Sequence, residues 1–545
     1  MKGKREMKKK TFHSVVALFL AIVMLLAVTA CTDPTSAPTT PTESKPGPTQ
    51  PGTQPSETEG PQSSIVPGTS FKYWTNYDIP AYLPWMDNRG SALFLQVYDN
   101  LLYKHHQDQN DIRGNLAKSW TVSDDGMVWV FQIKEDAYFT SGNQVKAESF
   151  VKTWDVAKEY QPRFFAPVEK YEATGEFELT ITLKSPSATF IYDLPMQPNV
   201  GVVDPAGLEQ YGGEDNRAAI GAGPYSIESY TSGQGFVLKA NPNYHNPDRA
   251  PSIETCEIVL IPDVNTALLA LMNNEIQCLN TVSIEVYNTL KDDNWQILSV
   301  LDRVNPYWFN AREVEIFRDD VVREALCHMI DWQAVTDLVY DGLYPVSKSY
   351  WEGPGMVPYS DKYKYDPELG LKMLKDAGYK PTDIAFTLLA DPDFTDVNIA
   401  IQGQFHELGL TSIEAVTYDG ATCYGMLKGG TYEMFPVHNG YGRESPLTVF
   451  SMGLVPTATQ KVMWLDYIDE ARYQEALQLY DAANVSPNFE TYLENVEKLT
   501  TLIQDECLAM GGLLVNRFYI LPENIKEIYP SYNGYIDFCY LRIAG

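Results

Sequence analysis

The chain has 545 residues and a formal net charge of −30. Because phosphate binding requires a basic surface, this charge argues against nucleic acid as a partner. The chain is too long for one hydrophobic core, so its folded part is expected to divide into two or three lobes. Tyrosine and tryptophan are abundant, with 35 and 10 copies, which suits a large ligand cleft.

The first 30 residues have the pattern of an export signal. Six basic residues lie among the first ten positions, and an uncharged apolar run, Val15–Val28, follows them. That run is shorter than the roughly 20 residues of a membrane-spanning helix, so it indicates a cleaved signal peptide over residues 1–30. The tetrad ending at Cys31 resembles the lipobox of bacterial lipoproteins, which implies cleavage before Cys31 and lipidation of its thiol. The alternative is an ordinary secretory signal with Cys31 near its cleavage site by chance.

Residues 31–68 are dominated by Thr, Pro, Ser, Gln and Gly. Such a segment buries too little apolar surface to offset the entropy lost on ordering, so we expect a disordered tether. In polyproline II geometry, at about 3.1 Å per residue, it could span on the order of 110 Å. With a lipid on Cys31 it would hold a folded body at the outer face of a membrane.

The first clear elements of the body lie between residues 114 and 186. Asp124–Gly126 has the composition of a tight turn, and the alternation of Trp129, Phe131 and Ile133 predicts a half-buried strand. Helical spacing begins at Ala147 and continues to Trp154. A second strand is predicted over residues 177–183, where apolar residues again alternate.

Helices are predicted farther along the chain. Apolar residues at helical spacing run from Val322 to Ile330, and acidic residues precede them in the first turn. Asp366 and Pro367 have the composition of an N-cap and first helical residue, and Gly378 that of the terminator. Strands and helices are mixed throughout, so the fold class is α/β or α+β.

Six cysteines follow Cys31, and no two of them form a CxxC pair. So few in so long a chain do not make a disulfide framework. Buried thiols are one interpretation, and one or two disulfides are the other. The six are Cys256, Cys278, Cys327, Cys423, Cys507 and Cys539.

Residues 114–154 resemble the signature region of the family 5 extracellular solute-binding proteins, the group of oligopeptide-, dipeptide- and nickel-binding proteins. The matching positions are Leu116, Ala117, Ser119, Trp120, Ser123, Asp124, Asp125, Gly126, Phe139, Gly142 and Ala147, whereas Asn115 and Ser149 depart from the usual Pro and Asp. The resemblance continues at Gly221–Tyr225, similar to the family's "GTGPY", and at residues 263–280 and 317–331. We expect the turn and the Gly221–Tyr225 segment to shape the scaffold, not to bind ligand.

This resemblance implies an α/β, three-lobed periplasmic-binding-protein-like fold (type II, cluster C), with a ligand cleft between lobes I and III. A discontinuous lobe I would take up residues 69–95, 218–305 and 506–545. Lobe II would be residues 96–217, and lobe III residues 306–505. Two strands that connect lobes I and III would form the hinge.

The resemblance also implies the function. The chain would be a lipid-anchored protein on the extracytoplasmic face of the bacterial cell membrane that captures a peptide or other small solute and delivers it to an ABC permease. We expect a monomer without cofactor or metal. The alternatives are a secreted hydrolase acting on glycans or peptides, and a solute receptor without a transport role.

Two segments are candidates for ligand contact. One is the end of the first strand of the body, where an aromatic residue and polar neighbours would face the cleft: Trp74, Asn76 and Tyr77. The other resembles the "GW-x-x-D-x-x-D-P" segment with which peptide-binding members hold the amino terminus of the ligand: His438, Asn439, Gly440, Tyr441, Arg443 and Glu444. Trp351 and Trp464 are further candidates for stacking on a ligand.

Gly442 stands where peptide-binding members carry the anchoring Asp. An ammonium group buried without a carboxylate loses its charge partner, at a cost of roughly several kcal/mol. Either Glu444 substitutes for that Asp, or the ligand has no free amino terminus, which opens sugars, opines, modified peptides and metal chelates.

Catalytic motifs are lacking in the sequence. It contains no GxSxG elbow, no GxGxxG and no Walker A loop. Residues 406–410 begin like the zinc motif HExxH, but Leu410 stands at the second histidine position. The sequence therefore predicts a binding protein without catalytic activity.

Overall fold

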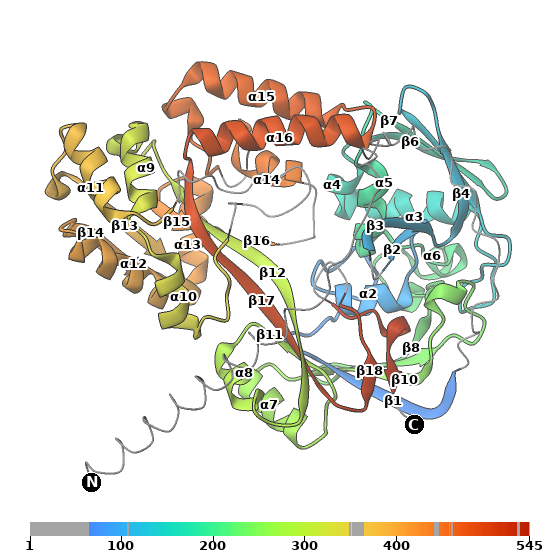
Figure 1. The fold of residues 1–545 in the computed structure, drawn as a ribbon. Coiled ribbons are helices and arrows are strands. Elements are labelled where there is room, and N and C mark those ends of the chain that lie inside the picture. Colours follow the sequence, from blue (N-terminus) through green and yellow to red (C-terminus); the bar gives the residue numbers. More distant parts are fainter. Residues whose placement is uncertain are drawn as a thin grey trace, which may run out of the picture. The chain divides into compact units, whose positions relative to one another are not determined.

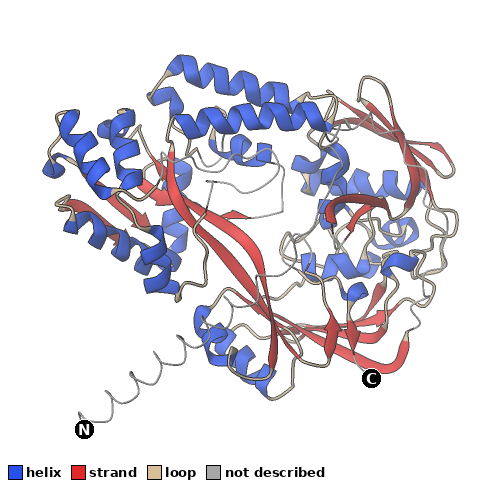
Figure 2. Ribbon diagram, in the orientation of Figure 1, coloured by secondary structure: helices blue, strands red, loops and turns tan. Residues whose placement is uncertain are grey.

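The computed structural model describes residues 65–105, 108–347, 350, 364–440, 446–456, 458, 461–530 and 535–543. All of these residues belong to one compact unit, residues 57–545. Helices and strands are interleaved along the chain (Figure 2). The α/β character predicted from the sequence is confirmed.

The first sheet has four strands in the order β1-β10-β9-β8. Strand β1 runs parallel to β10, and the other pairs are antiparallel. The bounds are β1 (Val66–Thr75), β8 (Tyr225–Thr231), β9 (Gly235–Ala240) and β10 (Ile253–Leu260). Phe71 and Tyr73 of β1 are buried against Phe538, near the carboxyl end of the chain, and in the same core as helix α2 (Ser91–Val97). A short ladder of β18 (Ile525–Glu527) and β19 (Arg542–Ile543) follows.

The second sheet is antiparallel, in the order β4-β5-β7-β6. The strands predicted at Trp129 and Leu179 are confirmed as β5 and β7, and the predicted helix is confirmed as α3, which buries Phe150 and Trp154. The elements of this region are β2 (Leu102–His105), β3 (Asp108–Gly114), β4 (Ala117–Val122), β5 (Val128–Ile133), α3 (Ala147–Tyr160), α4 (Pro162–Phe165), β6 (Val168–Gly175), β7 (Glu178–Leu183), α5 (Phe190–Asp193) and α6 (Pro205–Tyr211).

Two glycine positions explain motifs of the sequence. Gly126 has a φ of 72° in the turn between β4 and β5, and its N–H donates to the carbonyl of Ser123 at 2.8 Å. This left-handed conformation favours glycine. Gly221 lies against the backbone of Val97, where a Cβ would stand 1.8 Å from the carbonyl oxygen. Both motifs therefore serve close backbone packing.

The third sheet has the order β11-β17-β12-β15-β13-β14, and β16 also pairs with β12. Strands β12 and β17 are antiparallel along almost their whole length, from Trp295 opposite Pro522 to Trp308 opposite Ala509 (Figure 1). The bounds are β11 (Leu279–Thr281), β12 (Trp295–Phe309), β13 (Ala385–Ala390), β14 (Ser412–Thr417), β15 (Met434–Pro436), β16 (Asn439–Gly440) and β17 (Ala509–Pro522).

Strands β12 and β17 connect separate hydrophobic cores. Near one end of the pair, Tyr519 and Leu521 belong to the core of the first sheet, whereas Phe518 faces a second core. Near the other end, Tyr307 lies in that second core and Trp308 in a third. Because side chains alternate along a strand, two long strands supply side chains to all three cores.

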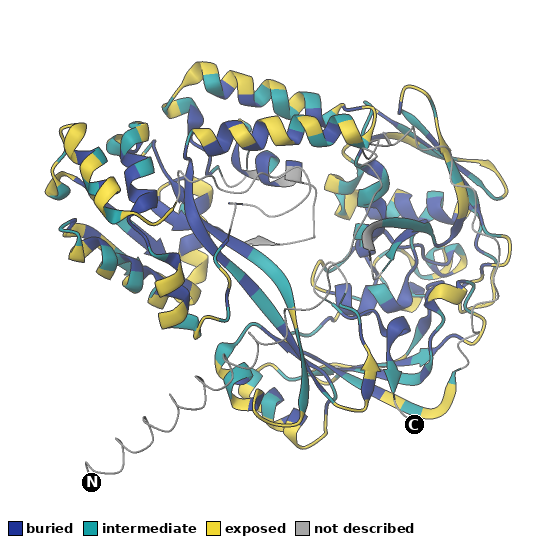
Figure 3. Cartoon of the chain, viewed as in Figure 1, coloured by how far each residue is buried: buried dark blue, intermediate teal, exposed yellow. Residues whose placement is uncertain are grey.

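Helices cover the third sheet and extend beyond it. The predicted N-cap Asp366 is confirmed, since its side chain accepts a backbone N–H bond at the start of α11. Asp319, predicted to lie in the first turn of its helix, is instead the N-cap of α9, where its side chain accepts the Val321 N–H. Helices α15 and α16 are buried on one side and exposed on the other (Figure 3). The helices are α7 (Val264–Met272), α8 (Ile284–Leu290), α9 (Asp320–His328), α10 (Trp332–Tyr340), α11 (Pro367–Asp376), α12 (Thr395–Glu407), α13 (Gly420–Gly429), α14 (Pro446–Gly453), α15 (Glu470–Asn484) and α16 (Phe489–Asp505). In the described part of the chain, none of the helices has the length and apolarity required to cross a membrane.

Candidate functional site

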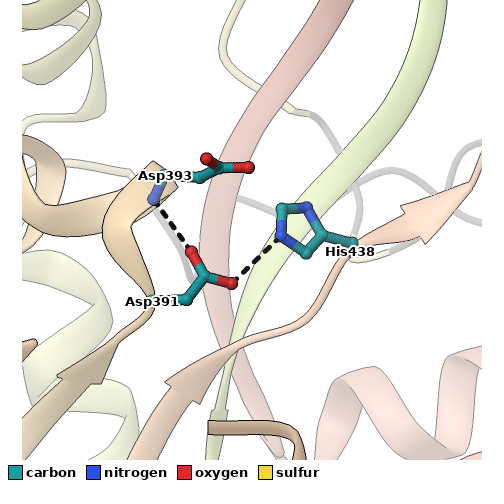
Figure 4. A group of neighbouring side chains, drawn as sticks. All are labelled: Asp391, Asp393 and His438. Carbon is teal, nitrogen blue, oxygen red and sulfur yellow. Dashed lines mark hydrogen bonds and ion pairs between the residues drawn. The ribbon is translucent and has the colours of Figure 1, made fainter. Parts of the chain in front are cut away.

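The loops that follow β13 and β15 meet at one edge of the third sheet. These two strands pair in parallel, so their carboxyl ends lie at the same edge. Asp391 and Asp393 follow β13, and His438 follows β15 (Figure 4). The carboxyl edge of parallel strands is the usual place for a ligand in α/β proteins. We call these three residues the edge cluster.

Asp391 is the central group of the edge cluster. One of its carboxylate oxygens accepts a hydrogen bond from the Asp393 N–H at 3.0 Å, and the other lies 3.5 Å from His438 Nε2. Burial acts to raise the pKa of Asp391, but the hydrogen bond and charge of His438 outweigh it and hold this pKa below its usual range. Asp391 therefore remains a carboxylate at neutral pH.

The edge cluster is chemically suited to a cationic group. The donor atoms of its three side chains lie within 4.8 Å of one another, and Asp393 and His438 are exposed. Carboxylates accept charge-assisted hydrogen bonds from an ammonium group, and carboxylate oxygens with imidazole are also ligands of divalent cations. The His438 ring packs beside Phe394, with the ring centroids 4.7 Å apart, which limits its orientations.

Arg303 adds positive charge beside the edge cluster. It lies on β12 directly opposite Gly440 of β16, and its charge contributes to the lowered pKa of Asp391. Its Nη1 lies 3.3 Å from a carboxylate oxygen of Asp302. The other Asp302 oxygen lies 2.7 Å from Arg517 Nε. Arg303 Nε is buried without a hydrogen-bond partner in the described part of the chain. An anionic ligand group could satisfy this donor.

The predicted segment at residues 438–444 is described only in part. His438 belongs to the edge cluster, and Asn439 and Gly440 add the short strand β16 to β12, with Asn439 opposite Val304. Tyr441, Arg443, Glu444 and Gly442 lie outside the described residues, as does Trp351. Trp464 is 4% exposed, and its indole N–H donates to the Tyr432 hydroxyl at 3.0 Å.

The predicted ligand contacts at the end of β1, Trp74, Asn76 and Tyr77, differ in burial and in their partners. Trp74 is 6% exposed, and its indole N–H donates to the Ile261 carbonyl at 2.8 Å, so very little of this residue is open to a ligand. Asn76 is exposed. The Tyr77 hydroxyl donates to the Arg89 carbonyl and lies 3.0 Å from the Tyr535 hydroxyl. The described contacts of this group are thus with residues other than the edge cluster.

A second polar cluster is buried around Arg249, which is 5% exposed. Its guanidinium lies 3.0 Å from a carboxylate oxygen of Asp99 and 3.0 Å from one of Asp537. His245 Nε2 lies 2.8 Å from the other Asp99 oxygen. Burial would raise the pKa of Asp99, but the His245 hydrogen bond and the Arg249 charge hold it below its usual range. We call this set the Arg249 network, and it ties the carboxyl-terminal segment to the residues after α2.

A cavity of about 70 Å³ adjoins the Arg249 network. It is lined by Asp99, Tyr103, Arg249, Asp537 and Lys104, among others. Burial lowers the pKa of Lys104 to about 8, although the negative charge of Asp193 acts to raise it. Both carboxylates of the network already pair with Arg249, so we regard this region as part of the framework.

Sequence reasoning missed Asp391, Asp393 and Arg303. Asp391 and Asp393 flank a proline, a pattern shared by many turns, and only the pairing of β13 with β15 brings them to His438. The sequence does contain a signal that could have identified Arg303. Asp302 and Arg303 are adjacent charges inside the otherwise mainly apolar strand Trp295–Phe309, where a charge requires a partner or a ligand.

Comparisons with known proteins identify the class. The structure of NikA from Brucella suis in complex with Fe(III)-EDTA matches with a TM-score of 0.76 at 18% identity, covering 87% of this chain and 99% of that one. The fold is therefore the α/β fold of periplasmic binding proteins. The sequence model of the bacterial extracellular solute-binding proteins, family 5 Middle, matches residues 111–461. The chain belongs to this family.

Curated relatives match a shorter part of the chain, at higher identity. The probable D,D-dipeptide-binding periplasmic protein DdpA of Escherichia coli is 26% identical over 345 residues, which cover 60% of this chain and 65% of DdpA. The glutathione-binding protein GsiB of Escherichia coli is 26% identical over 313 residues, 56% of this chain and 60% of GsiB. The matched regions thus span less than two thirds of each relative.

Proposed function

We propose that the chain is an extracytoplasmic solute-binding protein that captures a peptide or other small solute and delivers it to an ABC importer. A lipid on Cys31 would anchor it to the bacterial cell membrane through the tether of residues 31–68. It would act as a monomer without catalysis. Family membership supports the binding role. The structural observation that carries the proposal is the edge cluster beside Arg303, next to the two strands that connect the hydrophobic cores.

The three-lobe division is part of the proposal. Lobe I would comprise residues 69–95, 218–305 and 506–545, lobe II residues 96–217 and lobe III residues 306–505. Support comes from one hydrophobic core whose members all lie between Leu101 and Ala222. Further support comes from the long antiparallel pair of β12 and β17, which connects separate cores and fits a hinge between lobes I and III.

The proposed cleft would combine the predicted residues with Asp391 and Arg303. Gly442 has no carboxylate to pair with a ligand ammonium, and the Asp391 carboxylate would take that role. Arg303 would pair with an anionic group of the ligand. A small peptide with both charges fits this arrangement. D,D-dipeptides and glutathione, the ligands in the names of DdpA and GsiB, carry both kinds of group and make suitable first probes.

Native mass spectrometry of the purified chain and calorimetric titration would test the binding role. We expect saturable binding of one member of a panel containing a D,D-dipeptide, an L,L-dipeptide, glutathione and Fe(III)-EDTA, with the ligand recovered unchanged. An N-acetylated form of a peptide ligand should bind at least about tenfold more weakly, because it lacks the ammonium group. Equal affinity for both forms would contradict the role given to Asp391.

Asp391→Asn should weaken binding of a ligand with a free amine by about 10- to 100-fold, because the amide carries no charge to balance the ammonium. Asp481→Asn, an exposed position on α15, makes the same change of charge away from the edge cluster and serves as the matched control. Titration calorimetry measures both. If both variants bind the amine equally, the edge cluster does not hold it.

The alternative functions have different readouts. A secreted hydrolase acting on glycans or peptides would convert a bound probe, which mass spectrometry of the supernatant detects. A receptor without a transport role would bind solute, yet deletion of its gene would leave solute uptake unchanged. Loss of uptake on deletion, with the probe recovered intact, is the result expected for an importer component.

A further inference from the structure

Two of the six cysteines that the structure describes have their sulfurs in contact. Cys327 lies on α9, and Cys507 lies between α16 and β17, 180 positions later in the chain. Their Sγ atoms are 3.4 Å apart, and both residues are buried. We propose that these two thiols are a disulfide site, oxidised to a Cys327–Cys507 bond in the exported protein. The proposed extracytoplasmic location supplies the oxidising compartment.

The backbone around Cys507 supports a role for its side chain. Helix α16 ends at Asp505, and Cys507 follows with a φ of 52°. Glycine or asparagine usually occupies this left-handed position after a helix, because a Cβ is unfavourable there. A cysteine at this place, with its sulfur against a second cysteine, indicates that the thiol itself is used.

Arg323 holds the two segments together independently of the sulfurs. It lies on α9 one turn before Cys327 and is fully buried. Its guanidinium donates to the carbonyl oxygens of Glu506 at 2.6 Å and Cys507 at 3.2 Å, and also to that of Phe317 at 2.7 Å. The thiols are thus held in contact by the packed framework, and closing the bond requires a small movement of the sulfurs.

The chemistry requires an external oxidant, and we infer a disulfide compound such as a thiol-disulfide oxidoreductase or an oxidised low-molecular-weight thiol. One thiolate attacks the oxidant's disulfide and releases a thiol. The second cysteine then displaces the mixed disulfide, so that the chain loses two protons and two electrons and the oxidant becomes two thiols. Burial raises the pKa of the Cys327 thiol well above its usual value, so the folded, reduced protein should react slowly and oxidation should accompany folding.

Refolding the full-length chain in a glutathione redox buffer tests the proposal. Non-reducing digestion and mass spectrometry should give a linked peptide pair containing Cys327 and Cys507, two hydrogens lighter than the separate peptides. The thermal unfolding midpoint of the oxidised chain should fall by a few degrees when dithiothreitol is added, because the bond closes a long loop. Recovery of both peptides unlinked after refolding would overturn the proposal.

The Cys327→Ala/Cys507→Ala variant should show no shift of the midpoint with dithiothreitol. Cys256→Ala removes another buried thiol and should keep the wild-type shift, so it is the matched control. Because the mapping of the linked peptides needs no variant, misfolding of a variant leaves the test intact. A missing disulfide with intact solute binding would reject this inference alone, whereas loss of binding bears on the proposed function.

Discussion

Arg249→Met is expected to lower the free energy of unfolding by about 3 to 5 kcal/mol, the usual cost of removing one partner from a buried ion pair. The guanidinium is 5% exposed and lies between the carboxylates of Asp99 and Asp537, each at 3.0 Å. Methionine keeps most of the apolar contact but leaves both carboxylates without their shared cation. Urea unfolding at neutral pH measures the loss.

Arg217→Met is the matched control for this prediction. Arg217 also pairs with a carboxylate, that of Asp215. It lies over the ring of Tyr211, as Arg249 lies over that of Tyr103. Its side chain is exposed, so solvent screens the pair and the unfolding free energy should stay close to that of the wild type. Equal stability of Arg249→Met and Arg217→Met would show that the buried network adds nothing to the fold.

The Arg249 network also predicts that the stability of the protein depends on pH. Because the pKa of Asp99 is held below its usual value in the folded chain, its contribution to stability is present above the unfolded pKa. It is lost as the pH falls through the folded pKa. The stability difference between wild type and Arg249→Met should therefore shrink in strong acid.

Lys104→Met is expected to stabilise the protein at neutral pH by up to about 3 kcal/mol. Burial lowers the pKa of Lys104 from 10.5 to about 8. Each tenfold loss of proton affinity corresponds to about 1.4 kcal/mol, so keeping this lysine charged in the folded chain is costly. Between pH 8 and pH 10.5 the unfolded chain binds more protons than the folded one, so wild-type stability should rise with pH in this window.

Unfolding free energies measured at several pH values check this prediction. Lys104→Met should lack the rise between pH 8 and pH 10.5. Lys118→Met, at an exposed lysine paired with Glu135, should keep it and is the control. A wild-type curve parallel to that of Lys104→Met throughout this range would mean that Lys104 is not desolvated in the folded protein.

Prediction from the sequence succeeded for elements whose signal is local. The alternation at Trp129, Phe131 and Ile133 identifies β5, and Asp366 caps α11 as its position before Pro367 predicts. Periodicity and capping depend on residues within a few positions of one another. These signals therefore do not depend on how the rest of the chain folds.

The candidate site was accessible to sequence reasoning only in part. His438 was selected from its segment, but its partner Asp391 was not, because parallel pairing of β13 with β15 creates that contact. Trp74 shows the opposite case. An aromatic residue at a strand end suits a cleft wall and a core equally, and here Trp74 is buried in the same hydrophobic core as Leu271 and Leu279.

The sequence by itself determined the α/β class and the family, since each is carried by composition or by contiguous motifs. The export signal ending at Cys31 and the tether that follows it stay predictions from the sequence. Only the tertiary structure decided which distant residues meet: Asp391 with His438, Arg249 with Asp99 and Asp537, and Cys327 with Cys507. These contacts depend on strand order and on packing between segments far apart in the chain. No local pattern encodes such a distance, so the chemistry of the site emerges only from the fold.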